Sequence, residues 1–96
     1  MTLDDFKATL AHATPPEVPP LLRALWHDAK GDWETAHTMA QDVDDEHGAW
    51  VHAYLHRREG DEGNAGYWYR RARRPHSLVP LEEEWNEVAA ALLAND

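Results

Sequence analysis

Histidines His52 and His56 are the residues of this sequence whose type and spacing best suit a chemical role. Four residues apart on a helix, they lie on one face, where two imidazoles can share one zinc ion. The glutamate that follows the first histidine in zinc proteases is missing, because Ala53 stands there. A third ligand could come from His27, His37 or Glu59. A metal site at His52, His56 and His27 is therefore one hypothesis, and a structural role for these histidines is the other.

The structural alternative comes from an internal repeat with an offset of 29 residues. Residues 24–32 and residues 53–61 both carry an alanine, then a histidine, then a Gly-Asp pair. His27 and His56 hold matching positions in the two stretches, so a shared packing role explains both without metal. A fixed period of this size is typical of stacked helical hairpins.

Start and stop signals predict a single all-α domain of about six helices paired as antiparallel hairpins. Prolines mark linkers at 14–20 and 75–80, and no segment has the period of two that a strand requires. The expected helices span residues 1–13, 20–30, 33–44, 47–59, 62–73 and 80–95. They group into an N-terminal helix (1–13), a first repeat (18–46), a second repeat (47–75) and a C-terminal capping helix (80–95).

Two glycines and two alanines are expected at the closest contacts of the hairpins. Gly31 and Gly60 should close the turns with positive φ, because only glycine takes the left-handed conformation freely. Ala36 and Ala65 should be buried where the two helices of a hairpin touch.

The second repeat resembles a tetratricopeptide repeat. The matching positions are Ala53, His56, Gly60, Ala65, Tyr69 and Ala72. Residues 65–72 are still more similar to the Sel1-like variant, whose second helix reads Ala-x-x-Trp-Tyr-basic-basic-Ala. The resemblance spans residues 20–74 and implies a short right-handed helical array that binds a protein partner and carries no catalytic residue. Two repeats are fewer than such arrays need, so helices 1–13 and 80–95 are expected to cap them, or the protein forms a homodimer.

The composition excludes several classes of function. A net charge of −9 argues against nucleic-acid binding, since phosphate backbones are held by basic surfaces. The absence of cysteine excludes disulfides, thiolate metal sites and cysteine nucleophiles. No apolar run is long enough to span a membrane. We therefore expect a soluble cytoplasmic protein without a cofactor.

Arginines and tryptophans mark the expected binding surface. Most of the nine basic residues lie between positions 57 and 74 of an otherwise acidic chain. Five tryptophans exceed what so small a core can enclose, so Trp50 and Trp68 are expected to be partly exposed. The candidate surface comprises Trp50, Tyr54, Arg57, Arg58, Trp68, Arg70, Arg71 and Arg74. In the alternative interpretation, the acidic helix 80–95 lies across these arginines and partly hides them.

The sequence thus predicts a protein–protein interaction module whose partner is an acidic protein. A His-rich protein that binds a metal or a small ligand is the alternative. An enzyme comes third, because the sequence has no nucleophile motif, glycine-rich phosphate loop or acidic metal loop.

Overall fold

The computed structural model describes residues 1–95, which form six α-helices and one 3-10 helix and no strand. The helices are α1 (Leu3–Ala8), η1 (Thr9–Ala11), α2 (Pro20–Ala29), α3 (Trp33–Gln41), α4 (Glu46–Arg58), α5 (Glu62–Arg71) and α6 (Leu81–Ala94). The predicted all-α class is confirmed. The third helix ends earlier than expected, and the first turns into the 3-10 helix η1 before the proline linker. Within residues 1–95, none of the helices has both the length and the apolar character of a membrane span.

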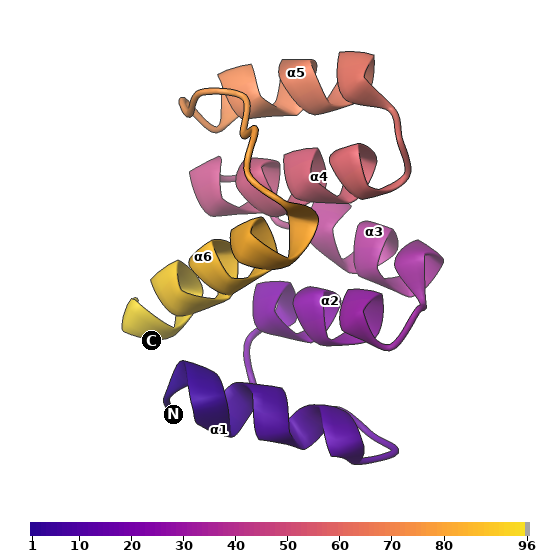
Figure 1. The fold of residues 1–96 in the computed structure, drawn as a ribbon, viewed down its shortest axis with the longest axis vertical. Helices are drawn as coiled ribbons and strands as arrows, with labels where there is room; N and C mark the ends of the chain where they lie inside the picture. The colour runs from indigo at the N-terminus through magenta and orange to yellow at the C-terminus, as the bar shows by residue number, and fades with distance from the viewer. Residues whose placement is uncertain (96) are drawn as a thin grey trace.

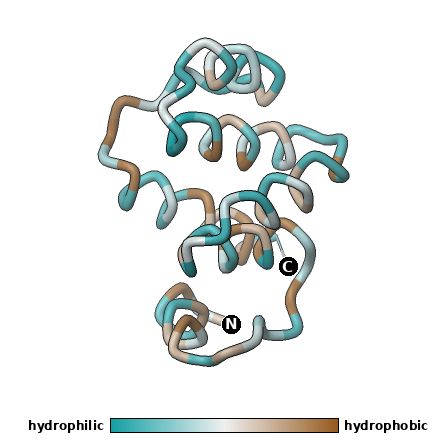
Figure 2. The backbone as a smooth tube through the Cα atoms, turned by 90° about the vertical axis from the view of Figure 1, so that its right-hand side faces the viewer, coloured by the Kyte–Doolittle hydropathy of each residue, from teal (hydrophilic) through white to brown (hydrophobic). Residues whose placement is uncertain are grey.

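The helices are stacked in chain order, and the last one returns across the stack. Figure 1 shows α1 to α5 following one another along the molecule, with α6 beside α2 and α4. Short turns join α2 to α3 and α4 to α5, and the two pairs meet where α3 packs on α4. Hydrophobic and hydrophilic segments alternate along the helices in Figure 2, as expected of helices with a buried side.

The two predicted glycine turns have the same geometry. Gly31 has a φ of 88° and Gly60 a φ of 87°. In both turns the next residue, an aspartate, donates its backbone N–H over 2.9 Å to the carbonyl of the histidine five positions earlier. This is the Schellman arrangement that closes a helix. The side chains of Asp32 and Asp61 then cap α3 and α5. The predicted positive φ of both glycines is confirmed.

Helix α4 lies at the centre of the fold, and each of its residues from Gly48 to His56 is buried. Gly48 allows a close approach, because a Cβ there would lie 1.9 Å from the carbonyl oxygen of Val43. Ala36 on α3 and Ala65 on α5 are fully buried, as predicted. Small side chains at these positions let the neighbouring helices pack tightly around α4.

Helix α6 is joined to α4 and α5 through the carboxylate of Glu84, which is only 1% exposed. The indole N–H of Trp50 donates to it over 3.1 Å, and the guanidinium of Arg57 donates over 2.8 Å. The hydroxyl of Tyr69 on α5 lies 2.7 Å from Oε1 and 2.5 Å from Oε2. Arg57 also donates to the carbonyl of Val79, just before α6. The buried charge is therefore both paired and hydrogen-bonded, as a carboxylate in a protein interior must be.

Replacing Glu84 with glutamine should destabilise the protein by about 3–5 kcal/mol, because it removes the charge that pairs with the part-buried Arg57 and disturbs the hydrogen bonds that meet at this buried side chain. The free energy of unfolding in urea measures this loss. Glu83→Gln on the same helix is the control, since Glu83 is exposed and its loss should change stability by less than about 0.5 kcal/mol. Equal stabilities of the two variants would mean that Glu84 does not hold α6 in place.

Helix α5 ends in the same kind of turn, but an arginine stands where the other two have glycine. Arg73 has a φ of 59°, and the backbone N–H of Arg74 donates over 3.1 Å to the carbonyl of Tyr69. A side chain with a Cβ is disfavoured in the left-handed region by roughly 1–2 kcal/mol. This turn is therefore strained where the two glycine turns are not.

Replacing Arg73 with glycine should stabilise the protein by about 1 kcal/mol, because it relieves this strain. Little is lost with the side chain, since its ion pair with Glu46 joins two exposed groups at 3.4 Å. Urea unfolding measures the change. Arg70→Gly, inside α5, is the matched control and should destabilise by about 1 kcal/mol. A loss of stability in both variants would contradict the prediction.

Candidate metal centre

Three histidines from two neighbouring helices meet in one cluster: His37 on α3, and His52 and His56 on α4. The Nε2 atoms of His37 and His52 are 2.8 Å apart. One ligand nitrogen from each of the three rings lies within 4.8 Å of the other two. The pairing of α3 with α4 thus brings a third imidazole to the pair on α4. We refer to these three residues as the histidine cluster.

Aromatic rings on both sides hold the histidine cluster in place. Trp33 stacks on His37 with ring centroids 4.7 Å apart, and Trp68 on α5 stacks on His52 at 3.8 Å. The indole N–H of Trp33 is anchored by donation to the carbonyl of Leu55 over 2.7 Å. Stacked rings restrict the rotation of the imidazoles, so their nitrogens are oriented before any ligand arrives.

The environment favours the neutral form of two of the imidazoles. Burial, followed by the neighbouring His37, His56 and Arg71, lowers the pKa of His52 to about 4. Burial, followed by the nearby His56, also lowers the pKa of His37. A histidine binds metal through an unprotonated nitrogen, so these two rings need to release no proton at neutral pH before they bind a metal.

A carboxylate fixes the third ring. Nδ1 of His56 lies 2.7 Å from Oε1 of Glu59. An ionised carboxylate only accepts hydrogen bonds, so Nδ1 carries a proton, and in the neutral ring Nε2 keeps its lone pair. The same pairing orients metal-binding histidines in known zinc sites. Asp61 lies near both groups, but its side chain already caps α5.

The prediction that His27 joins His52 and His56 in a metal site is wrong, because His37 takes the third place in the cluster. His27 is half-buried on α2, where its ring packs edge-on against Trp26 at 5.2 Å. The repeat gives His27 and His56 equal positions within their hairpins but different neighbours. His56 lies on α4, which follows α3 in the chain, and its ring packs against His37 of that helix. His27 lies on α2, which is preceded only by α1, η1 and the proline linker.

The expected exposure of part of the candidate binding surface is also wrong. Trp50 is 4% exposed and Tyr54 is 1% exposed, because α4 is covered by its neighbours on several sides. Arg57 turns inward to Glu84, as the alternative with the acidic last helix predicts. Arg58 keeps an exposed side chain but forms an ion pair with the buried Asp28 at 3.0 Å.

The rest of the predicted surface lies on and just after α5. The guanidinium of Arg71 sits over Trp68 at 5.0 Å and over Tyr67 at 6.0 Å. Arg74 covers the ring of Trp50 at 3.5 Å, and Arg70 is exposed. An exposed surface of arginines and aromatic rings remains suited to protein binding, and its partner stays a prediction.

Comparison with known proteins adds no relative. No protein-family model, curated protein or solved structure was found to match this chain. The resemblance to tetratricopeptide and Sel1-like repeats therefore stays a prediction, and the function of the histidine cluster has to be argued from its own geometry.

The stability of the metal-free protein should fall as the pH is lowered from 7 to 5. Because the pKa of His52 is about 4 in the fold, the unfolded chain, whose histidine titrates near pH 6.5, binds the proton first. The contribution of the neutral His52 to the free energy of unfolding is fully present above pH 6.5 and is lost as the pH falls from 6.5 to about 4. The expected loss from pH 7 to pH 5 is about 1–2 kcal/mol, measured by urea unfolding with a chelator present.

The control for this pH dependence is His52→Phe, which keeps a stacked ring but cannot titrate. The titratable and charged groups that face His52 are His37 from α3, His56 from α4 and Arg71 from α5, and all of them remain in the variant. Its stability should therefore vary less with pH than that of the wild-type protein. An equally steep profile would assign the titration to another group.

Proposed function

We propose that this protein binds one zinc ion through His37, His52 and His56. The observation that carries the proposal is the approach of three imidazole nitrogens to within 4.8 Å of one another. In a tetrahedral zinc site with Zn–N bonds of about 2.0–2.1 Å, ligand nitrogens are separated by about 3.3 Å. His37 and His52 need to move apart by roughly half an ångström to reach that separation.

The donor set favours zinc over harder cations. Imidazole nitrogen suits zinc and its transition-metal neighbours, whereas calcium and magnesium prefer oxygen ligands. The carboxylate of Glu59 accepts a hydrogen bond from Nδ1 of His56, which stabilises a metal-binding tautomer. Three protein ligands leave a fourth position for water or another ligand, which is the arrangement of reactive zinc sites. His52 also lines a surface cavity of about 550 Å³, which gives a small molecule room beside the cluster.

A purely structural cluster is the competing interpretation. Three imidazoles packed between tryptophans fill space, but burying an imidazole nitrogen away from water costs free energy that an apolar ring avoids. Among the described residues, the hydrogen bonds of the cluster are one between His37 and His52 and one between His56 and Glu59. A bound metal ion would provide a partner for the nitrogens of all three rings.

Titration of zinc into chelator-stripped protein, followed by calorimetry, tests the proposal. We expect one zinc per chain and a higher unfolding temperature in its presence. His37→Phe should abolish this binding, and Glu59→Gln should weaken it by about 10- to 100-fold, because Glu59 acts only through His56. His27→Asn is the matched control and should bind zinc as the wild-type protein does.

Circular dichroism of each variant separates loss of binding from loss of the fold. If the folded wild-type protein takes up no zinc, or if His37→Phe binds as tightly as the wild type, the cluster is a packing element and the proposal is wrong.

A further inference from the structure

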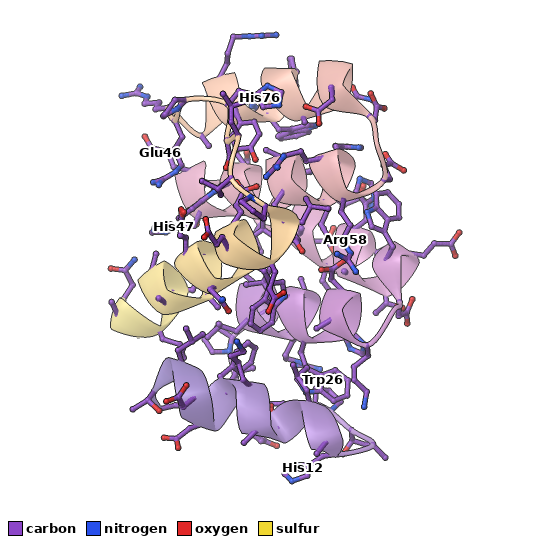
Figure 3. All side chains as sticks on the ribbon, in the orientation of Figure 1. His12, Trp26, Glu46, His47, Arg58 and His76 are labelled. Atoms are coloured by element: carbon purple, nitrogen blue, oxygen red, sulfur yellow. The ribbon has the colours of Figure 1, made fainter. Side chains whose placement is uncertain are left out.

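The connection between α5 and α6, residues 72–80, holds a leucine out into solvent. Leu78 is 91% exposed, the most exposed of the large hydrophobic side chains in residues 1–95. The backbone on both sides of it is held in place. The carbonyl of Val79 accepts a hydrogen bond from Arg57, and the ring of His76 packs against α5, as Figure 3 shows. A side chain displayed on a fixed backbone loses little conformational freedom when a partner covers it.

A cavity of about 310 Å³ lies beside Leu78, between this connection, α4, α5 and α6. Its apolar wall includes Trp50, Pro75 and Val79. The guanidinium of Arg74 lies 3.5 Å from the centroid of the Trp50 ring and forms part of the same wall. The surface therefore carries a protruding aliphatic side chain and, next to it, a hollow with room for a second one.

Opposite charges stand on the two sides of this cavity. Arg74 follows α5 and Glu87 lies on α6, and both line the cavity with exposed side chains. Within residues 1–95, neither side chain forms an ion pair. Arg70 on α5 and Glu83 on α6 stand four positions before them and are exposed as well. The surface is thus basic on the side of α5 and acidic on the side of α6.

Such a surface is complementary to a second copy of itself. A two-fold axis beside Leu78 brings the basic side of each copy onto the acidic side of the other, and it brings each leucine to the hollow of the other copy. Opposite charges across an interface speed the encounter and fix its register. A purely acidic partner would be attracted by the two arginines but repelled by the two glutamates, whereas a second copy matches both sides.

We propose that this protein forms a symmetric dimer in which Leu78 of each copy enters the cavity of the other. Arg74 of one copy faces Glu87 of the second copy, and this contact occurs twice. The dimer does not depend on the proposed zinc site, which uses other side chains of α4.

Sedimentation equilibrium over a range of protein concentrations tests the dimer. The wild-type protein should pass from the mass of one chain to the mass of two. Leu78→Asp should weaken this association at least about 10-fold, because it carries a charge into a partly apolar cavity. Ala13→Asp places the same charge on the exposed connection before α2 and should associate normally. A single-chain mass at every concentration, or equally tight association of Leu78→Asp, would overturn the proposal.

Exchange of the two charges tests how the copies face each other. Arg74→Glu and Glu87→Arg should each associate more weakly than the wild type, because each variant brings like charges together. An equal mixture of the two variants should recover the association, since both contacts of the mixed dimer again join opposite charges. Circular dichroism of each variant confirms that it is folded. A mixture that associates as weakly as either variant alone would mean that these side chains do not meet and would contradict the proposal.

Discussion

The burial of the Glu84 carboxylate is the constraint on which the arrangement of this small protein depends. A charge with 1% exposure is tolerated only with several donors, and α4 and α5 supply them as Trp50, Arg57 and Tyr69. These donors sit on two different helices, so the carboxylate fixes the position of α6 relative to the pair formed by α4 and α5. On the other side of α4, Asp28 on α2 performs a similar role toward Tyr54 and Arg58.

The buried carboxylates of Glu84 on α6 and Asp28 on α2 therefore both bind side chains of α4, each from a different neighbouring helix. These contacts determine where the other side chains of α4 lie. With Trp50 and Arg57 turned toward α6 and Tyr54 turned toward α2, His52 and His56 are left to face α3. The histidine cluster is thus positioned by contacts elsewhere on the same helix. A rigid helix with fixed rotation about its axis can orient two imidazoles more accurately than a loop can.

The features that could be predicted from the sequence are those that local signals determine. Gly31 and Gly60 close helices because of their own conformational freedom, and the aspartates after them cap the next helices wherever these pack. The surroundings of α4 could not be predicted in this way, because they depend on where α6 returns in the fold. The choice between His37 and His27 was also open, because it depends on which neighbouring helix the histidines of α4 face. One signal did exist, since Trp33, His37 and Ala40 form a helical stripe on α3 that can face α4.

The polar side chains of α4 differ in the kind of group that accepts or donates their hydrogen bonds, and this difference bears on function. Trp50, Tyr54 and Arg57 each donate to a buried carboxylate, and such contacts are sufficient to explain their presence in the interior. His52 is different, because its hydrogen-bond partner among residues 1–95 is another histidine, His37. A phenylalanine would stack on Trp68 as well and would carry no nitrogen to desolvate. The zinc ion proposed above would use the nitrogen that a phenylalanine lacks, whereas packing alone does not require that nitrogen.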